Sequence, residues 1–317
     1  MSRSIFSQGS TPSTARSTDT AQRAWRASSS SSSGFELVDL LHLGHPRVIA
    51  SYLLPGDEPA LVDCGPSSCL GALEEGLAAH GVALADVRHL VLTHIHLDHA
   101  GAAGILVRRN PRLRVYVSEI GAPHLVDPSR LERSARRLYG DDFDRLWGEL
   151  APVPEEAVEI IGDRVLDLVA WPTPGHASHH LSFLGSDGSC YAGDAAGVRI
   201  EPSSFIVPVA PPPDIDLEAW ERSLDEIAAR RPARLCLPHF GVVEDPQEHL
   251  PRMRERLLTW AERVRNGLSE EEFVRAAEAE LEGAAAPEWG SYTQAGPLWQ
   301  SYAGLKRYWE KRVAREA

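Results

Sequence analysis

From residue 35 onward, short apolar runs alternate with clusters of Gly, Pro and Asp, a pattern that predicts β-strands joined by turns. The runs fall into two groups. We expect the first strands at residues 35–43, 47–54, 59–62, 89–92 and 113–117. We expect the second group at residues 158–161, 165–169, 181–184, 190–192 and 235–237. Two rounds of short strands, each followed by helices, predict an α/β protein in which two mixed sheets pack face to face with helices outside.

Helical spacing of apolar residues appears between and after these strands. The pattern predicts helices at residues 67–80, 101–109 and 217–230. Residues 118–150 also look mostly helical, with breaks at Pro123 and Pro128, and form an insertion. From Pro246 to the end the pattern is helical again. We therefore divide this part of the chain into a main domain at 35–245, which includes the insertion, and a helical extension at 246–317 that packs on it.

The first 34 residues differ from the rest of the chain. They hold four arginines and a single acidic residue, Asp19, and they end in a serine run at residues 28–33. A segment with so few apolar residues cannot offset the entropy lost on ordering, so we expect a disordered tail. It lacks the apolar stretch of a secretory signal peptide. An organelle-targeting segment and a mis-assigned start remain the alternatives.

Composition excludes several classes of protein. The 317 residues are 43% hydrophobic and 24% charged, which is globular and excludes a fibrous or wholly disordered chain. The net charge of -13 argues against binding nucleic acid through bulk positive charge. The four cysteines form no C-x-x-C pair, which favours reduced thiols in a cytoplasmic protein. No apolar run is long enough to predict a membrane span.

The strongest chemical signal is a cluster of His94, His96, Asp98 and His99 directly after the apolar strand 89–92. In an extended segment His94 and His96 point to the same side, and the turn that follows can bring the other two residues close. Three imidazoles and a carboxylate so close together suit a borderline metal such as zinc.

Three later strands also end in a metal-binding type of residue. His176 lies in the loop after strand 165–169, Asp194 follows strand 190–192, and His239 follows strand 235–237. Any one of these could be an ordinary core residue. Because four strand-end loops all offer His or Asp, we expect them to converge on one site.

These residues, in this order, resemble the H-x-H-x-D-H motif and the later ligands of the metallo-β-lactamase-fold hydrolase superfamily, in its glyoxalase-II-like and lactonase-like branch. The resemblance covers roughly residues 35–245 and implies a four-layer αββα sandwich. It also implies that His94, His96 and His176 bind one metal, that Asp98, His99 and His239 bind a second, and that Asp194 bridges both. Asp63 resembles the family's early Asp, which supports the metal loops without binding metal.

The resemblance implies two zinc ions, with iron or manganese as alternatives, and a hydroxide between them that attacks a substrate carbonyl. Asp98 can also accept a proton from the attacking water. We expect a hydrolase of a small ester, thioester or lactone. Acyl-homoserine lactonases usually carry a Tyr where this chain has Gly197, and true β-lactamases usually carry Arg where it has His99, so neither narrower activity is favoured.

Two other classes share the motif. One is a phosphodiesterase or nuclease, which the acidic charge disfavours; the other is an iron-dependent redox protein resembling the persulfide dioxygenases. The expected partner is a small molecule, and a homodimer is left open. Pocket candidates are His180, Tyr139, Trp147 and Phe205. His42 and His45 are expected to be solvated loop residues, and His249 has no motif context.

Overall fold

The computed structural model describes residues 34–316. All of these residues except Gly34 belong to one compact unit, Phe35–Ala317. The predicted tail falls almost entirely on residues 1–33, outside the described residues. No helix among the residues that the structure describes is long and apolar enough to cross a membrane.

The first of two six-stranded sheets has its strands in chain order. They are β1 (Glu36–Asp39), β2 (Ala50–Leu54), β3 (Ala60–Val62), β4 (His89–Val91), β5 (Arg114–Val117) and β6 (Val158–Ile160). β1, β2 and β3 pair antiparallel, whereas β3, β4, β5 and β6 run parallel. The carboxyl ends of β3 and β4 therefore meet at the same edge, which brings the segments after Val62 and Val91 together.

The second sheet runs in the order β12-β11-β10-β9-β8-β7. Its strands are β7 (Arg164–Val165), β8 (Leu168–Pro172), β9 (Leu181–Leu184), β10 (Ser189–Tyr191), β11 (Arg234–Leu237) and β12 (Gly241–Val243). β10 and β11 are parallel and the other neighbours are antiparallel. Both sheets are mixed, as the sequence predicted.

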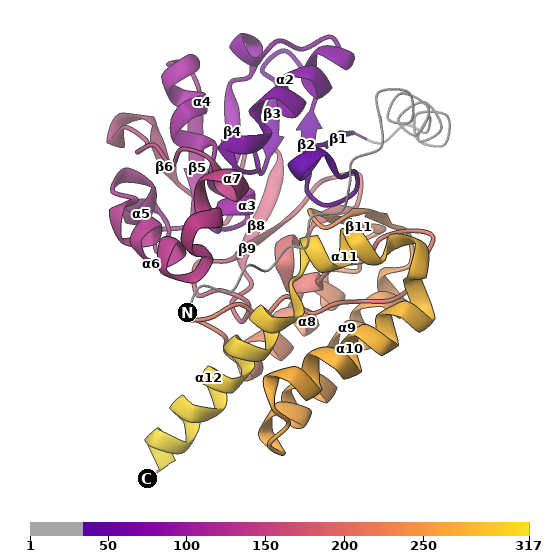
Figure 1. Cartoon of the computed structure of the whole chain (residues 1–317). Coiled ribbons are helices and arrows are strands. Elements are labelled where there is room, and N and C mark those ends of the chain that lie inside the picture. Colours follow the sequence, from indigo (N-terminus) through magenta and orange to yellow (C-terminus); the bar gives the residue numbers. More distant parts are fainter. Residues whose placement is uncertain (1–33, 317) are drawn as a thin grey trace. The chain divides into compact units, whose positions relative to one another are not determined.

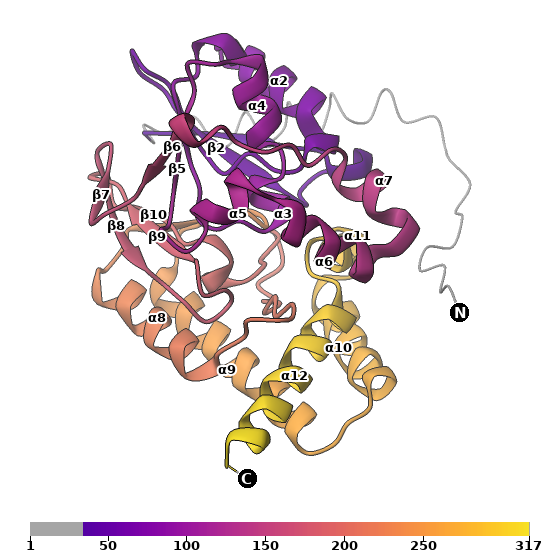
Figure 2. The same ribbon diagram turned by 90° about the vertical axis from the view of Figure 1, so that its left-hand side faces the viewer.

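Helices lie on the outer face of each sheet (Figures 1 and 2), so the predicted four-layer sandwich is confirmed. The helices of the first half are α2 (Leu70–Ala79), α3 (Leu97–Ala100), α4 (Ala103–Arg109), α5 (Ala122–Val126), α6 (Ser129–Tyr139) and α7 (Phe143–Trp147). Those of the second half are α8 (Leu217–Ala229), α9 (Pro246–Arg265), α10 (Glu270–Ala285), α11 (Trp289–Ala295) and α12 (Leu298–Glu316). In Figure 2, α2 and α4 cover the first sheet, and α8 and α9 cover the second.

The core between the sheets contains aromatic rings from both. The rings of Tyr52 on β2 and Tyr191 on β10 meet edge to face, with their centroids 5.4 Å apart. The Tyr52 hydroxyl donates to the Leu237 carbonyl at 2.7 Å, so its polar end is satisfied inside the core. A second, smaller apolar cluster joins Leu97 of α3 to Ala135 and Phe143 of the insertion. The insertion therefore packs directly on the loop that carries the His-rich motif.

One predicted strand has a different form. Residues 165–169 were expected to be one strand, but the chain turns there and forms the hairpin of β7 and β8. The turn places Leu166 at φ 50°, a left-handed conformation that usually calls for Gly or Asn. Because no such residue stands there, the apolar pattern gave no sign of the turn.

Candidate metal centre

The motif that follows β4 begins extended and then turns into a short helix. His96 keeps extended backbone angles, φ -61° and ψ 155°, immediately before α3 begins at Leu97. Asp98 and His99 therefore lie in the first turn of α3, while His94 and His96 precede it. The single motif thus supplies side chains to two neighbouring positions.

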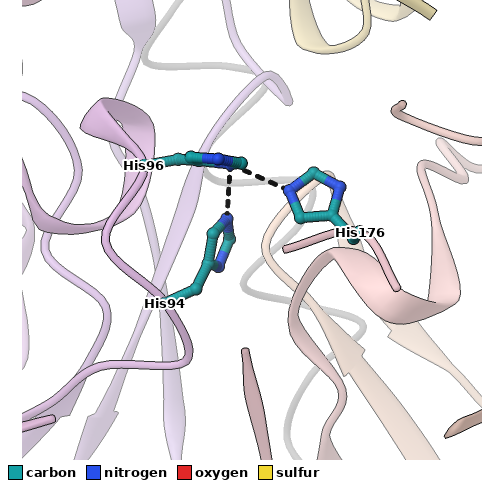
Figure 3. A group of neighbouring side chains, drawn as sticks. All are labelled: His94, His96 and His176. Atoms are coloured by element: carbon teal, nitrogen blue, oxygen red, sulfur yellow. Dashed lines mark hydrogen bonds between the residues drawn. The ribbon is translucent and has the colours of Figure 1, made fainter. Parts of the chain in front are cut away.

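The first group of side chains is His94, His96 and His176, shown in Figure 3. His176 comes from the loop between β8 and β9. The Nδ1 atom of His96 lies 3.1 Å from Nε2 of His94 and 2.9 Å from Nε2 of His176. Three imidazole nitrogens therefore converge on one point.

The second group is Asp98, His99 and His239. His239 follows β11 in the second sheet. Its Nε2 atom lies 3.3 Å from Oδ2 of Asp98 and 3.3 Å from Nε2 of His99. The two groups are thus built from both sheets, at the edge where their strand-end loops meet.

Asp194 lies between the two groups. Its Oδ2 atom is 3.4 Å from Nε2 of His176, and its Oδ1 atom is 3.4 Å from Nε2 of His99 and 3.6 Å from Nε2 of His239. The residue is 1% exposed, and Oδ1 receives no hydrogen bond from the described residues. One carboxylate oxygen therefore faces each group, the geometry that a bridging ligand requires.

Hydrogen bonds fix which nitrogen of each ring carries its proton. Nδ1 of His176 lies 2.7 Å from the Val209 carbonyl, and Nδ1 of His239 lies 2.7 Å from the Val48 carbonyl. A carbonyl only accepts, so in both rings Nδ1 is the donor. In the neutral rings Nε2 then carries a lone pair, and it points toward the other ligands.

Asp63 fixes two more rings in the same way. Its Oδ2 atom accepts from Nδ1 of His99 at 2.9 Å and from the Thr93 hydroxyl at 2.8 Å. Because the Thr93 proton is used there, the same hydroxyl oxygen accepts from Nδ1 of His94 at 3.0 Å. Asp63 thus orients the motif through hydrogen bonds. It directly follows β3 and has a left-handed backbone conformation, with φ 57°.

This arrangement fits a bound cation. Nδ1 of His96 faces the lone pairs of two rings and can donate a proton to only one of them. Burial and the neighbouring imidazoles lower the pKa of His94 strongly and that of His96 to about 3, so these rings stay neutral. Neutral nitrogens aimed at one point, beside buried carboxylates, are the donors that a divalent metal accepts.

The second group calls for positive charge more strongly. Burial alone would lower the pKa of His99, but the carboxylates of Asp194, Asp98 and Asp63 outweigh it and raise the pKa. The pKa of His239 is raised for the same reason, mainly by Asp194. A cation or protons must therefore compensate the acidic groups here.

Both ring nitrogens of His180 are engaged in hydrogen bonds, and neither is free to bind a metal. Its Nε2 atom accepts the backbone N–H of Asp194 at 3.1 Å, and its Nδ1 atom donates to the Thr173 hydroxyl at 2.8 Å. Thr173 in turn contacts the Ser182 hydroxyl at 2.8 Å. His180 therefore supports the Asp194 turn, and its lone pair is not directed at the metal centre.

The aromatic candidates separate into two places. Tyr139 and Trp147 of the insertion pack edge to face at 5.1 Å, and the pKa of Tyr139 is raised by burial and by the charge of Asp98. Tyr139 therefore lies near Asp98 of the second group, with Trp147 packed against it, and we call this pair the aromatic wall. Phe205 instead packs against Tyr292 and beneath the guanidinium of Arg256.

The structure shows that two histidines without a sequence motif, His42 and His249, are buried and hydrogen-bonded near the centre's supporting residues. His42 was expected to be solvated, but it is 2% exposed, stacks on Trp147, and bonds to the Leu146 carbonyl at 2.9 Å. His249 is 0% exposed and bonds to the Ala196 carbonyl, two residues after Asp194. Neither has a motif, because their partners are far away in the chain.

Several known proteins are similar to this chain. The model of the metallo-beta-lactamase superfamily matches residues 45–239. A metallo-beta-lactamase fold-containing protein of Sulfurisphaera tokodaii is 27% identical over 220 residues, covering 66% of this chain and 79% of that protein. A protein named N-acyl homoserine lactonase AttM, from Agrobacterium fabrum, is 32% identical over 118 residues, covering 34% of this chain and 39% of its own.

A solved structure shows the same fold. The metallo-beta-lactamase family protein of Thermus thermophilus superposes with a TM-score of 0.62 at 24% identity, covering 90% of this chain and 94% of that one. The match to the family model spans more than half of the chain and contains all seven His and Asp side chains of the centre. The chain therefore belongs to the metallo-beta-lactamase superfamily and is a metal-dependent hydrolase.

Proposed function

We propose that this protein is a dinuclear zinc hydrolase of small carbonyl esters, thioesters or lactones. The observation that carries the proposal is the pair of adjacent donor groups with Asp194 between them. His94, His96 and His176 would hold one ion, and Asp98, His99 and His239 would hold the other. Five imidazoles and two carboxylates make a nitrogen-rich set, which favours zinc over manganese.

Bound zinc would supply Lewis-acid polarisation of a substrate carbonyl and a lowered pKa of the attacking water. The chain's own residues supply the rest. The side chain of Asp98 is 21% exposed, whereas those of His99, His239 and Asp194 are at most 2% exposed. Asp98 is therefore the carboxylate that solvent can reach, and we assign to its oxygens the proton released by the attacking water.

The aromatic wall supports an apolar substrate. Leu97, which precedes Asp98 in the chain, belongs to the small apolar cluster, and Tyr139 and Trp147 of the insertion pack against that cluster. Such a surface suits the hydrocarbon part of an ester or lactone. The relative named as an N-acyl homoserine lactonase supports a carbonyl substrate of this type.

Gly197 argues against narrowing the proposal to acyl-homoserine lactones. Its φ is 73°, and a Cβ atom there would lie 2.8 Å from Sδ of Met253 and 2.9 Å from the Val207 carbonyl. A Tyr at this position would have no room. Any lactonase activity of this chain would therefore need a different way of positioning its substrate.

The four free cysteines are buried, which suits the reducing cytoplasm that we propose as the protein's location. The test of the function is metal analysis of the purified protein together with a panel of lactones, thioesters, phosphodiesters and β-lactams. We expect two zinc equivalents per chain and hydrolysis of carbonyl substrates that a chelator abolishes and zinc restores. Full activity in His96→Ala and Asp194→Ala variants would overturn the proposal, and one tightly bound iron would favour the redox alternative.

A further inference from the structure

The turn that carries Asp194 is held by three buried rings. The turn is the short 3-10 helix Gly193–Ala196. The backbone N–H of Asp194 donates to His180, the Trp220 indole donates to the Ala195 carbonyl at 2.8 Å, and Nε2 of His249 lies 2.8 Å from the Ala196 carbonyl. Three consecutive residues are thus bonded to rings from three different parts of the chain.

The third ring comes from outside the part of the chain that the family model matches. The match ends at residue 239, whereas His249 lies in α9. Met253 lies one helical turn after His249 and packs against Gly197, the residue that follows the 3-10 helix. A Cβ atom added to Gly197 would lie 2.8 Å from Sδ of Met253. Residues four apart lie on one face of a helix, so α9 presents one face to the end of the Asp194 turn.

Packing alone does not explain a buried histidine at position 249, because one of its ring nitrogens has no hydrogen-bond partner among the described residues. Nε2 of His249 must be the donor, because the Ala196 carbonyl only accepts, and Nδ1 is then a bare acceptor. That Nδ1 atom is buried and has no hydrogen-bond partner among the described residues. An unpaired buried polar atom destabilises the folded state, and an apolar residue would avoid this loss. The single bond to Ala196 is the compensating feature.

We propose that His249 is a positioning residue for Asp194, through which the C-terminal extension sets the orientation of the bridging carboxylate. This proposal rests on one part of the proposed function, the binding of metal by Asp194, and does not depend on the substrate. The bond from His249 fixes the peptide plane at Ala196, and the bond from His180 fixes the N–H of Asp194. The carboxylate is then held between the two donor groups without any adjustment of the backbone.

The test compares His249→Gln with His249→Asn. The Gln amide nitrogen can reach the place of Nε2 and donate to Ala196, whereas the shorter Asn amide cannot. We expect the Asn variant to bind zinc about 10–100-fold more weakly at one site, by competition with a chelator. We expect the Gln variant to stay close to wild type. The cobalt(II)-substituted Asn variant should also show an altered visible spectrum.

Trp260→Phe is the matched control, because Trp260 is 0% exposed on the same helix and packs on Phe273 instead of the turn. It should lower the denaturation midpoint but leave zinc affinity unchanged. The proposal fails if folded His249→Asn binds both zinc ions as tightly as wild type, or if Trp260→Phe loses as much affinity. A wild type that binds zinc but hydrolyses nothing in the panel would defeat the proposed function alone, since zinc affinity reports on His249 independently.

Discussion

The Nε2 atoms of His99 and His239 face each other at 3.3 Å, although the proton of each neutral ring is already donated from Nδ1, to Asp63 and to the Val48 carbonyl. In neutral rings two lone pairs would face each other here, beside the carboxylates that raise the pKa of both rings, so this pair requires a proton or a metal cation between the two atoms. We therefore predict that metal removal destabilises the folded chain. A metal present at a thousand times its dissociation constant contributes about 4 kcal/mol. Thermal denaturation with chelator, and again after zinc is added back, checks this; an unchanged melting temperature would contradict it.

Asp194→Asn should reduce the zinc content from two equivalents to one or fewer, because one neutral amide replaces the carboxylate that faces both groups. Hydrolysis should fall at least about 100-fold, the size expected for a group that organises the reacting centre. Elemental analysis and steady-state kinetics measure the two effects. Asp167→Asn, at an exposed turn, is the control and should match wild type. If the Asp194→Asn variant still holds two zinc ions, the bridging role is excluded.

Thr173→Val removes the acceptor of the His180 Nδ1 proton but keeps the shape of the side chain. We expect a loss of about 1–3 kcal/mol in the free energy of unfolding, because a buried donor is left unpaired. Zinc affinity should also fall, about tenfold, since His180 holds the N–H of Asp194. Urea denaturation and chelator competition measure the two losses. Ser178→Ala, at an exposed site in the same loop, should change neither.

Gly175→Ala should be strongly destabilising. Its φ is 137°, and a Cβ atom would lie 2.3 Å from Cα of Trp220. The loop before His176 or α8 would have to move, at a cost of about 2 kcal/mol or more. Gly290→Ala is the matched control, because it lies in α11 with nothing within 4 Å of the added carbon, and should stabilise by up to about 1 kcal/mol. Equal urea midpoints for the two variants would refute the prediction.

The pH dependence of stability should include Asp39. Burial raises its pKa to about 6, although the N–H groups of Arg47 and Leu41 and the charge of Arg47 oppose the rise. Since the folded pKa lies above the unfolded value of 3.8, the group's contribution is fully present below pH 3.8 and is lost as the pH rises through 6. Relative to Asp39→Asn, the wild type should lose up to about 3 kcal/mol between pH 4 and pH 7. Parallel urea-stability curves for the two proteins would contradict this.

The sequence predicted the layers and the strand-end loops because both depend on local patterns. His94, His96 and His99 stand at fixed distances after a buried strand, so one short motif identified them. His42 and His249 were missed because their roles come from contacts with Trp147 and Ala196, which no local pattern encodes.

The same limit applies to the aromatic residues. Phe205 and Tyr139 look alike in the sequence, yet one packs on Tyr292 and the other lies near Asp98. Which of two rings lies near a site depends on how loops fold over the sheets. Apolar character alone cannot distinguish these outcomes.

The hydrogen bonds on Nδ1 of His176, His239 and His99 have a kinetic consequence. Each ring is oriented before an ion arrives, so capture requires no search among side-chain rotamers. If these rings hold metal as proposed, we expect the rate of metal exchange to depend on how fast an ion loses its hydration water and passes Tyr139 and Trp147. Substitutions at Tyr139 or Trp147 should change the rates of metal binding and metal release by the same factor and leave the equilibrium affinity unchanged.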